Sequence, residues 1–186
     1  LKAVIASTYQ AVSGSGAQGI IELEEQIRAI SAGESPQPRV YKHPIAYNVI
    51  PFAGKLVDDG RGETDEEQKL RNESRKILGK PELKVHATCV RVPVVTTHSL
   101  AVHAVLDRAV TADEVRALLA NAEGVVVTDD PANKIFPTPI DVVGTDPTVV
   151  GRIRVSKEYP NEIDFFVCGD NLRKGAALNT AQIAEV

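Results

Sequence analysis

The residues best suited to chemistry are an arginine and a histidine that stand seven positions apart in the run KVHATCVRVPVVTTHS, from Lys84 to Ser99. Arg91 offers two parallel N–H donors that suit a carboxylate, and His98, with an intrinsic pKa of about 6.5, can carry protons near neutral pH. On a straight strand an odd separation places two side chains on opposite faces, so the pair converges only if the chain bends at Pro93 or the two threonines before the histidine. The spacing alone leaves open a solvent-facing arginine and a turn histidine.

A second charged pair lies on the clearest helix of the sequence, TDEEQKLRNESRKILG. Thr64 is its expected N-cap, Glu67 completes a capping box, and Gly79 ends it. Glu66 and Lys69 stand three positions apart on one side of that helix. A solvated surface ion pair, worth a few tenths of a kcal/mol, is the alternative to a binding role.

The turn Ser13–Gly16 follows a strand pattern and precedes a helix pattern, so its backbone N–H groups could approach a phosphate or a nicotinamide closely. It lacks the full dinucleotide fingerprint, and a simple tight turn is the alternative. Gln10, just before it, is suited to positioning a substrate or to lying at the surface as an ordinary amide. Cys89 and Cys168 sit in strand-like runs without metal-ligand spacing, so we expect buried free thiols rather than nucleophiles or a metal site.

Composition excludes several classes of function. The chain has 186 residues with a net charge of -4, which favours one domain and gives no electrostatic attraction to nucleic acid or an anionic membrane. No apolar run reaches the roughly 18 residues of a transmembrane helix, and the free cysteines indicate a reducing compartment, so we expect a cytoplasmic protein. The chain begins at Leu1 without any methionine, so we expect it to be a piece of a longer protein.

Strand and helix patterns alternate irregularly, which favours an α+β fold. We expect the helix at 17–31 to bury one apolar face, and Pro93 to place its strand at a sheet edge or a bulge. His103 is expected at the surface. The expected strands are 1–9, 45–51, 84–99, 100–108, 124–128, 149–155 and 163–168, and the expected helices are 17–31, 64–79, 111–124 and 173–185.

Six segments, taken together and in order, resemble aspartate-β-semialdehyde dehydrogenase. They are STYQAVSGSG, YNVIPFAG, EEQKLRNESRKILG, ATCVRVPVVTTHS, VGRIR and GDNLRKGAALNTAQIAE. The resemblance implies that residues 1–186 are the catalytic and dimerisation domain, without the nucleotide-binding Rossmann domain. It further implies a mixed, largely antiparallel sheet with helices packed on one face, as in the C-terminal domain of glyceraldehyde-phosphate dehydrogenase. The terminal helix, about 173–185, is then expected to pack against the nucleotide-binding domain.

The resemblance implies an NADP-dependent oxidoreductase that interconverts L-aspartate-4-semialdehyde and L-4-aspartyl phosphate through a cysteine thioester. This reaction serves lysine, threonine, methionine and diaminopimelate biosynthesis. The family's cysteine lies in a motif upstream of STYQ, so the 186 residues alone are expected to be inactive. The expected partners are the semialdehyde, phosphate and a second copy of the chain, in a homodimer or a tetramer.

Site residues are carried over from the family by their positions. His98 resembles the acid/base catalyst that takes the thiol proton and serves the tetrahedral intermediate. The resemblance assigns Gln10, Glu66 and Arg91 to the substrate, Lys69 to phosphate, and Ser13, Gly14 and Asn171 to NADP. Two alternatives stay open: a dimerisation module that is not catalytic as isolated, and a related N-acetylglutamyl-phosphate reductase.

Overall fold

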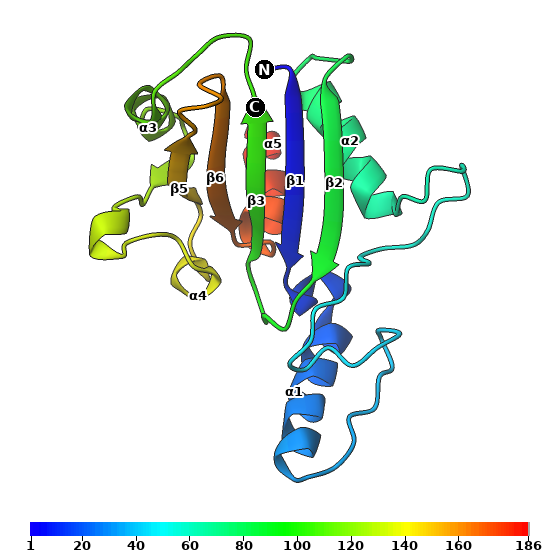
Figure 1. The fold of residues 1–186 in the computed structure, drawn as a ribbon. Helices are drawn as coiled ribbons and strands as arrows, with labels where there is room; N and C mark the ends of the chain where they lie inside the picture. Colours follow the sequence, from blue (N-terminus) through cyan, green and yellow to red (C-terminus); the bar gives the residue numbers. More distant parts are fainter. Residues whose placement is uncertain (186) are drawn as a thin grey trace.

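A computed structural model describes residues 1–185 as an α+β fold built on one six-stranded mixed sheet (Figure 1). The strand order is β2-β1-β3-β6-β5-β4. Pairs β1–β2 and β4–β5 are parallel, and the other three neighbouring pairs are antiparallel. The strands are β1 (Ala3–Gln10), β2 (Lys84–Arg91), β3 (His98–Val105), β4 (Val125–Val127), β5 (Thr148–Val155) and β6 (Glu162–Gly169).

Residues 1–185 also form five α-helices and three short helical turns, of which the last turn and the last helix follow the final strand. The helices are α1 (Ala17–Ser31), α2 (Asp65–Ile77), α3 (Ala112–Ala120), α4 (Pro139–Val142) and α5 (Leu178–Ala184). The turns are η1 (Val12–Ser15), η2 (Pro131–Asn133) and the π-helical η3 (Arg173–Ala177). Helix α5 therefore begins later than the helix expected at 173–185, because its first turn is wound as a π-helix. No helix among residues 1–185 is long and apolar enough to cross a membrane.

Helices α2 and α3 pack on the same face of the sheet, as expected (Figure 1). On the opposite face the short helix α4 packs through Val142 against Val149 and Cys168. Glu67 of α2 accepts a hydrogen bond from the backbone N–H of Cys89 in β2. At the other side, Val115 of α3 packs in a core cluster with Ala104 and Ile163. The sheet thus carries α2 and α3 on one face and leaves most of the other, here called the open face, without a helix.

Local sequence signals account for the ends of α2 and α3. Thr64 and Thr111 each form a complete capping box with the glutamate three residues later, as the sequence predicts. Gly79 follows α2 in the left-handed region, at φ +60°, where glycine has no steric penalty. These signals fix where α2 begins, and therefore which of its residues reach the sheet.

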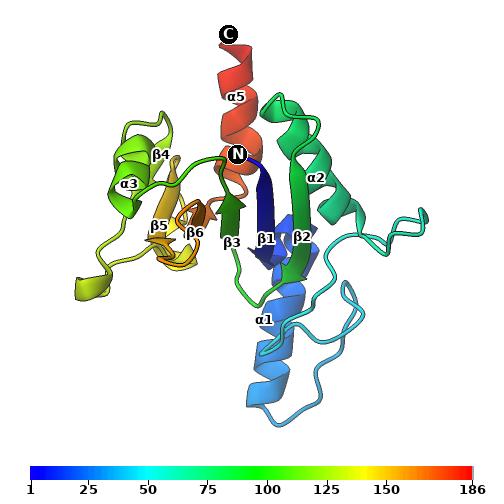
Figure 2. The same ribbon diagram turned by 45° about the horizontal axis from the view of Figure 1, so that its top comes forward.

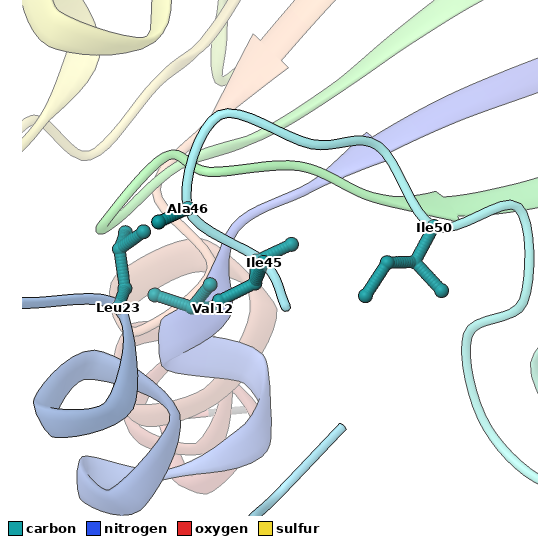
Figure 3. Close-up of a cluster of buried hydrophobic side chains, with 5 residues drawn as sticks. All are labelled: Val12, Leu23, Ile45, Ala46 and Ile50. Atoms are coloured by element: carbon teal, nitrogen blue, oxygen red, sulfur yellow. The ribbon is translucent and has the colours of Figure 1, made fainter. Parts of the chain in front are cut away.

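Helix α1 and the first part of the segment 32–64 extend past the end of the sheet in both views, and the later part returns to the side of the sheet where α2 begins (Figures 1 and 2). A small core joins them, made of Val12, Leu23, Ile45, Ala46 and Ile50 (Figure 3). This core places segment 40–55 beside the ends of β1 and β2.

The apolar face predicted for α1 is partly wrong. Ile21 and Ile27 are exposed, whereas Glu22 and Gln26 are buried. The physical reason is hydrogen bonding to the segment that follows: Gln26 Oε1 accepts the backbone N–H groups of Ile45 and Ala46, at 2.8 and 3.1 Å. Glu22 likewise accepts the N–H groups of residues 39 and 40. Buried polar side chains here supply acceptors to a segment that lacks sheet partners.

Three smaller expectations are also corrected. The strand expected at 45–51 does not form in the described structure. Within this segment only Ile50 pairs with another residue, in an isolated bridge with Arg91. Pro44 and Pro51 flank this segment and have no N–H to extend a ladder. His103 is not simply at the surface, because it is half-buried and its ring nitrogens lie 3.3 and 3.0 Å from the carboxylates of residues 162 and 164. The run 84–99 is broken rather than continuous, since residues 92–97 connect β2 to β3.

Candidate functional site

Arg91 and His98 meet because the chain leaves β2 at one and enters β3 at the other. Strand β1 lies between these two strands, so both residues flank its C-terminal end. Gln10, the last residue of β1, is the register partner of Arg91. The predicted bend around Pro93 is therefore confirmed, and β2 is an edge strand as the proline indicates.

The backbone of a single residue, Ala11, holds both side chains. The backbone N–H of Ala11 donates to His98 Nδ1 at 3.1 Å, and the carbonyl oxygen of Ala11 accepts from Arg91 Nη1 at 2.6 Å. Ala11 is fully buried, so water does not compete for these bonds. Arg91 and His98 are consequently fixed relative to each other through the backbone of β1.

Gly14 keeps the space between the two side chains open. A Cβ at this position would lie 2.9 Å from Arg91 Nη1 and 3.0 Å from His98 Nε2. Its φ is not among the positive values, so the requirement for glycine is spatial rather than conformational. The turn that contains Gly14 thus passes directly over the Arg91–His98 pair.

Arg91 is a buried charge without an ionic partner. Arg91 is only 7% exposed. Within residues 1–185 it forms no ion pair, and its Nε–H has no hydrogen-bond partner. Burying an unpaired charge costs several kcal/mol. An anionic group entering beside Arg91 would offset that cost, which is the usual signature of a carboxylate or phosphate site.

Gln10, Glu66 and Lys69 form one chain of hydrogen bonds. Gln10 Nε2 donates to Glu66 Oε2 at 3.1 Å, and Lys69 Nζ donates to Glu66 Oε1 at 2.8 Å. The hydroxyl of Thr8 donates to Gln10 Oε1 at 3.1 Å, which fixes the orientation of the Gln10 amide. Burial would raise the pKa of Glu66, but the bonds from Lys69 and Gln10 outweigh it and lower that pKa. Bonding to Glu66 raises the pKa of Lys69.

His98 is held in its neutral form. Burial, followed by the positive charge of Arg91, lowers the pKa of His98 to about 4. The charges of Glu66 and Asp170 act in the opposite direction but are weaker. The imidazole is therefore uncharged at neutral pH.

Ser13 and Asn171 contact each other at the edge of this site. Asn171 Nδ2 donates to Ser13 Oγ at 3.0 Å, and Asn171 Oδ1 accepts the backbone N–H of Thr97 at 2.9 Å. Thr97 is a buried residue with a φ of +83°, a strained value for a β-branched side chain. Asn171 therefore stabilises the backbone immediately before His98.

A pocket of about 830 Å³ opens over these residues. Among the predicted site residues, Gln10, Gly14, Glu66, Arg91 and His98 line it, whereas Ser13, Lys69 and Asn171 lie outside its lining. Apart from Ser15 and Asp65, the remaining wall comes from segments 40–43 and 50–55, which were not predicted to belong to the site. The signal in the sequence was the pair of polar residues Glu22 and Gln26 within the apolar pattern of the 17–31 helix. These two side chains hold the segment that follows the helix.

This geometry agrees with the comparisons to known proteins. A family model described as semialdehyde dehydrogenase, dimerisation domain, matches residues 1–174. The chain belongs to this family. It is 52% identical over 197 residues to an aspartate-semialdehyde dehydrogenase of Streptomyces akiyoshiensis, and 44% identical over 193 residues to one of Bacillus subtilis. All of the chain is covered in both cases, but only 56% and 55% of these relatives, so the chain spans about half their length.

Solved structures support the same family and fold. An aspartate semialdehyde dehydrogenase II of Vibrio cholerae, complexed with ASA, has a TM-score of 0.94 and 36% identity, covering 100% of this chain and 54% of that one. An enzyme of Candida albicans with NADP has a TM-score of 0.60 and 22% identity, covering 92% of this chain and 46% of that one, which shows likeness of fold only.

Neither cysteine of this semialdehyde dehydrogenase domain has the low thiol pKa of a nucleophile. Burial raises the pKa of Cys89 to about 11, and burial also raises the pKa of Cys168. Both are buried free thiols, as the sequence predicts. Residues 1–185 contain no group of three or more histidine, cysteine or acidic side chains that could hold a metal ion.

Proposed function

We propose that the longer protein containing this domain is an NADP-dependent, phosphorylating aspartate-semialdehyde dehydrogenase. The observation that carries the proposal is Arg91, a buried and unpaired cation in a pocket that also holds His98. The semialdehyde is an amino acid with a free α-carboxylate, and a guanidinium fork binds such a group through two parallel bonds. Membership of the family supplies the reaction class.

The other polar residues of the pocket match the remaining charges of the substrate. Glu66, kept ionised by its lowered pKa, receives the α-ammonium group. Gln10, oriented by Thr8, positions the carbonyl group that reacts. Lys69 is already bonded to Glu66, so it offers its remaining ammonium donors to phosphate as that group approaches the pocket. His98 faces the reacting carbonyl as the catalytic side chain.

The nucleophile in this proposal comes from outside the 186 residues. Cys89 and Cys168 are buried and their pKa values are raised. We therefore assign the thioester to a cysteine outside these residues, in the region that the longer relatives also contain. The domain by itself is consequently expected to be inactive. Helix α5, which has no buried residue, is expected to pack against the nucleotide-binding domain.

NADP, when bound, supplies the hydride acceptor or donor of the reaction. Gly14 lines the pocket, and a Cβ at this position would displace Arg91 and His98. Because glycine has no side chain, the flat nicotinamide ring can approach the backbone of this turn closely. Ser13 and Asn171 bond to each other beside this turn and orient it. We therefore assign these three residues to the cofactor side of the site.

We further propose a homodimer formed through the open face of the sheet. Ile5 and Tyr9 of β1 are 42% and 39% exposed there, and the ring of Tyr9 lies 5.9 Å from that of Phe166 in β6. An exposed apolar face of this kind is typical of an interface between copies of a chain. Tetramers assembled from such dimers are compatible with this arrangement.

The test is NADPH formation from L-aspartate-4-semialdehyde by the complete protein, with and without phosphate. We expect phosphate-dependent activity, strongly reduced in His98→Ala and absent from the 186-residue chain. Arg91→Lys keeps the charge but loses the fork, so kcat/KM should fall at least tenfold while the unfolding midpoint changes little. Unchanged kcat/KM in Arg91→Lys would remove Arg91 from the carboxylate role, and no activity in well-folded complete protein would leave the dimerisation module as the function.

A further inference from the structure

We propose that Glu67 is a positioning residue whose carboxylate sets the separation between Glu66 and Arg91, the two groups assigned above to the α-ammonium and the α-carboxylate of the semialdehyde. The inference deepens the proposed function and rests on it for the identity of these substrate groups. Its basis is the place of Glu67 between the helix that carries Glu66 and the strand that carries Arg91. Glu67 lies outside the lining of the pocket, so it acts through other residues rather than on the substrate.

The two carboxylate oxygens of Glu67 bind different elements. Oε2 accepts the backbone N–H of Thr64 at 2.9 Å, which completes the capping box at the start of α2. Oε1 accepts the backbone N–H of Cys89 in β2 at 3.0 Å. Thr64 and Cys89 are 2% and 1% exposed, so water does not readily replace either bond. One carboxylate therefore fixes the first turn of α2 against β2.

The positions of Glu67 in its helix and of Cys89 in its strand carry this contact to the site. Successive residues of an α-helix point about 100° apart, which lets Glu66 face the pocket while Glu67 faces the sheet. Residues two apart in a strand share a face, so Cys89 and Arg91 lie on the same side of β2. A shift of α2 relative to β2 would thus change the separation of Glu66 and Arg91.

A second contact at this end of α2 runs through the backbone of segment 53–55. Ala53 N–H donates to the carbonyl oxygen of Cys89 at 3.1 Å, and Lys55 N–H donates to Asp65 Oδ1 at 2.7 Å. A Cβ on residue 54, a glycine, would lie 3.0 Å from Glu66 Cγ. This segment packs against Glu66 but reaches α2 only by way of a loop, whereas Glu67 joins the first turn of α2 to the sheet directly.

Helix α3 supplies a matched control, because it begins with the same capping box. Glu114 Oε2 accepts the backbone N–H of Thr111 at 2.6 Å, and Glu114 N–H donates to Thr111 Oγ1 at 3.1 Å. The other carboxylate oxygen of Glu114 lies 3.7 Å from Arg108 Nη1 at the surface. Glu114→Ala therefore removes a capping acceptor alone, while Glu67→Ala removes a capping acceptor together with the bond to β2.

Kinetics of the complete protein separate a positioning role from a purely structural one. In Glu67→Ala we expect the KM values for the semialdehyde and for phosphate to rise about tenfold or more, because Glu66 and Lys69 both lie on α2, while kcat and the KM for NADP change less than about threefold. Glu114→Ala should change each constant less than about twofold. Equal KM values in the two variants, or a lower kcat with unchanged KM in Glu67→Ala, would overturn the inference.

Hydrogen exchange in the same proteins does not depend on turnover. We expect the Cys89 amide to exchange about tenfold faster or more in Glu67→Ala and to be unchanged in Glu114→Ala. Unchanged exchange in Glu67→Ala would overturn the inference. An amide has one acceptor oxygen where two N–H groups need one, so Glu67→Gln carries both tests if Glu67→Ala does not fold, with faster exchange expected at Cys89 or Thr64.

Failure of the proposed function gives a different result. Absence of turnover in well-folded unmodified protein would reject that function, and the substrate role of Glu67 with it. The exchange measurement would then still decide whether Glu67 joins α2 to β2.

Discussion

Arg91 and His98 illustrate what a sequence can and cannot disclose at the scale of single residues. Their types predict carboxylate binding and proton chemistry, and the proline between them predicts a bend. The sequence could not disclose that Ala11, an unremarkable residue in it, binds both side chains through its backbone. Backbone donors and acceptors are the same in every residue, so no pattern of side chains marks this one.

The lowered pKa of His98 predicts a dependence of stability on pH. The folded protein holds this ring neutral down to about pH 4, while an unfolded chain protonates it near pH 6.5. Its contribution is complete above pH 6.5 and is lost as the pH falls toward 4, by up to ~3 kcal/mol. Urea denaturation at pH 7.5 and 4.5 should show a larger loss in the unmodified chain than in His98→Gln. Equal losses would contradict the lowered pKa.

Gly14→Ala should damage activity more than folding. The added methyl group would meet Arg91 and His98 at about 3 Å, so one of them must shift. We expect kcat/KM of the complete protein to fall at least tenfold, and the free energy of unfolding to change by less than about 1 kcal/mol because both side chains border a pocket. Gly175→Ala is the matched control, since its Cβ would meet only Asn171 Cβ at 3.9 Å. Similar kcat/KM in both variants would show that the space above Gly14 is not needed.

At the scale of elements, the predictions succeeded where the cause is local. The capping boxes at Thr64 and Thr111 lie within four residues of the helices they begin, and both are present. The strand expected at 45–51 was wrong because the partners of this segment are distant in the sequence: its first two residues bond to Gln26 of α1, and within the segment only Ile50 pairs with the sheet. The pocket wall built by this segment was missed for the same reason.

Gln26→Ala should release the segment that forms this wall. The change leaves the backbone N–H groups of Ile45 and Ala46 buried without acceptors, at a cost of about 2–4 kcal/mol. We expect lower stability in urea denaturation and faster hydrogen exchange confined to residues 37–55. Gln18→Ala, on the exposed side of the same helix, is the control and should leave both measurements unchanged. Unchanged exchange in Gln26→Ala would mean that the segment is held by other contacts.

At the scale of the whole molecule, α2 and α3 cover one face of the sheet, while the short helix α4 packs on part of the other. The face under α2 and α3 is incompletely covered, because an apolar groove of about 830 Å³ lies beside α3. The chain spans about half the length of the relatives it matches. The α+β class was predictable, since it follows from the order of strand and helix patterns, whereas the shared face of α2 and α3 was implied only by the family resemblance.

The open face leads to a prediction about assembly. We expect the 186-residue chain to have the mass of a dimer in light scattering at tens of micromolar, and Ile5→Glu to have that of a monomer, because a buried unpaired carboxylate opposes association. Ile77→Glu is the matched control: its isoleucine is 80% exposed at the end of α2, away from the open face. A monomer mass for the unmodified chain would contradict the proposed interface.

The backbone contacts of Ala11 also bear on how such a site changes in evolution. Both of its contacts use main-chain atoms, so a replacement of the methyl side chain deletes neither of them. Substitutions at position 11 therefore have little direct effect on the distance between Arg91 and His98. Insertions or deletions near the end of β1 would instead disturb both contacts at once, which predicts that natural variants keep the length of the chain here.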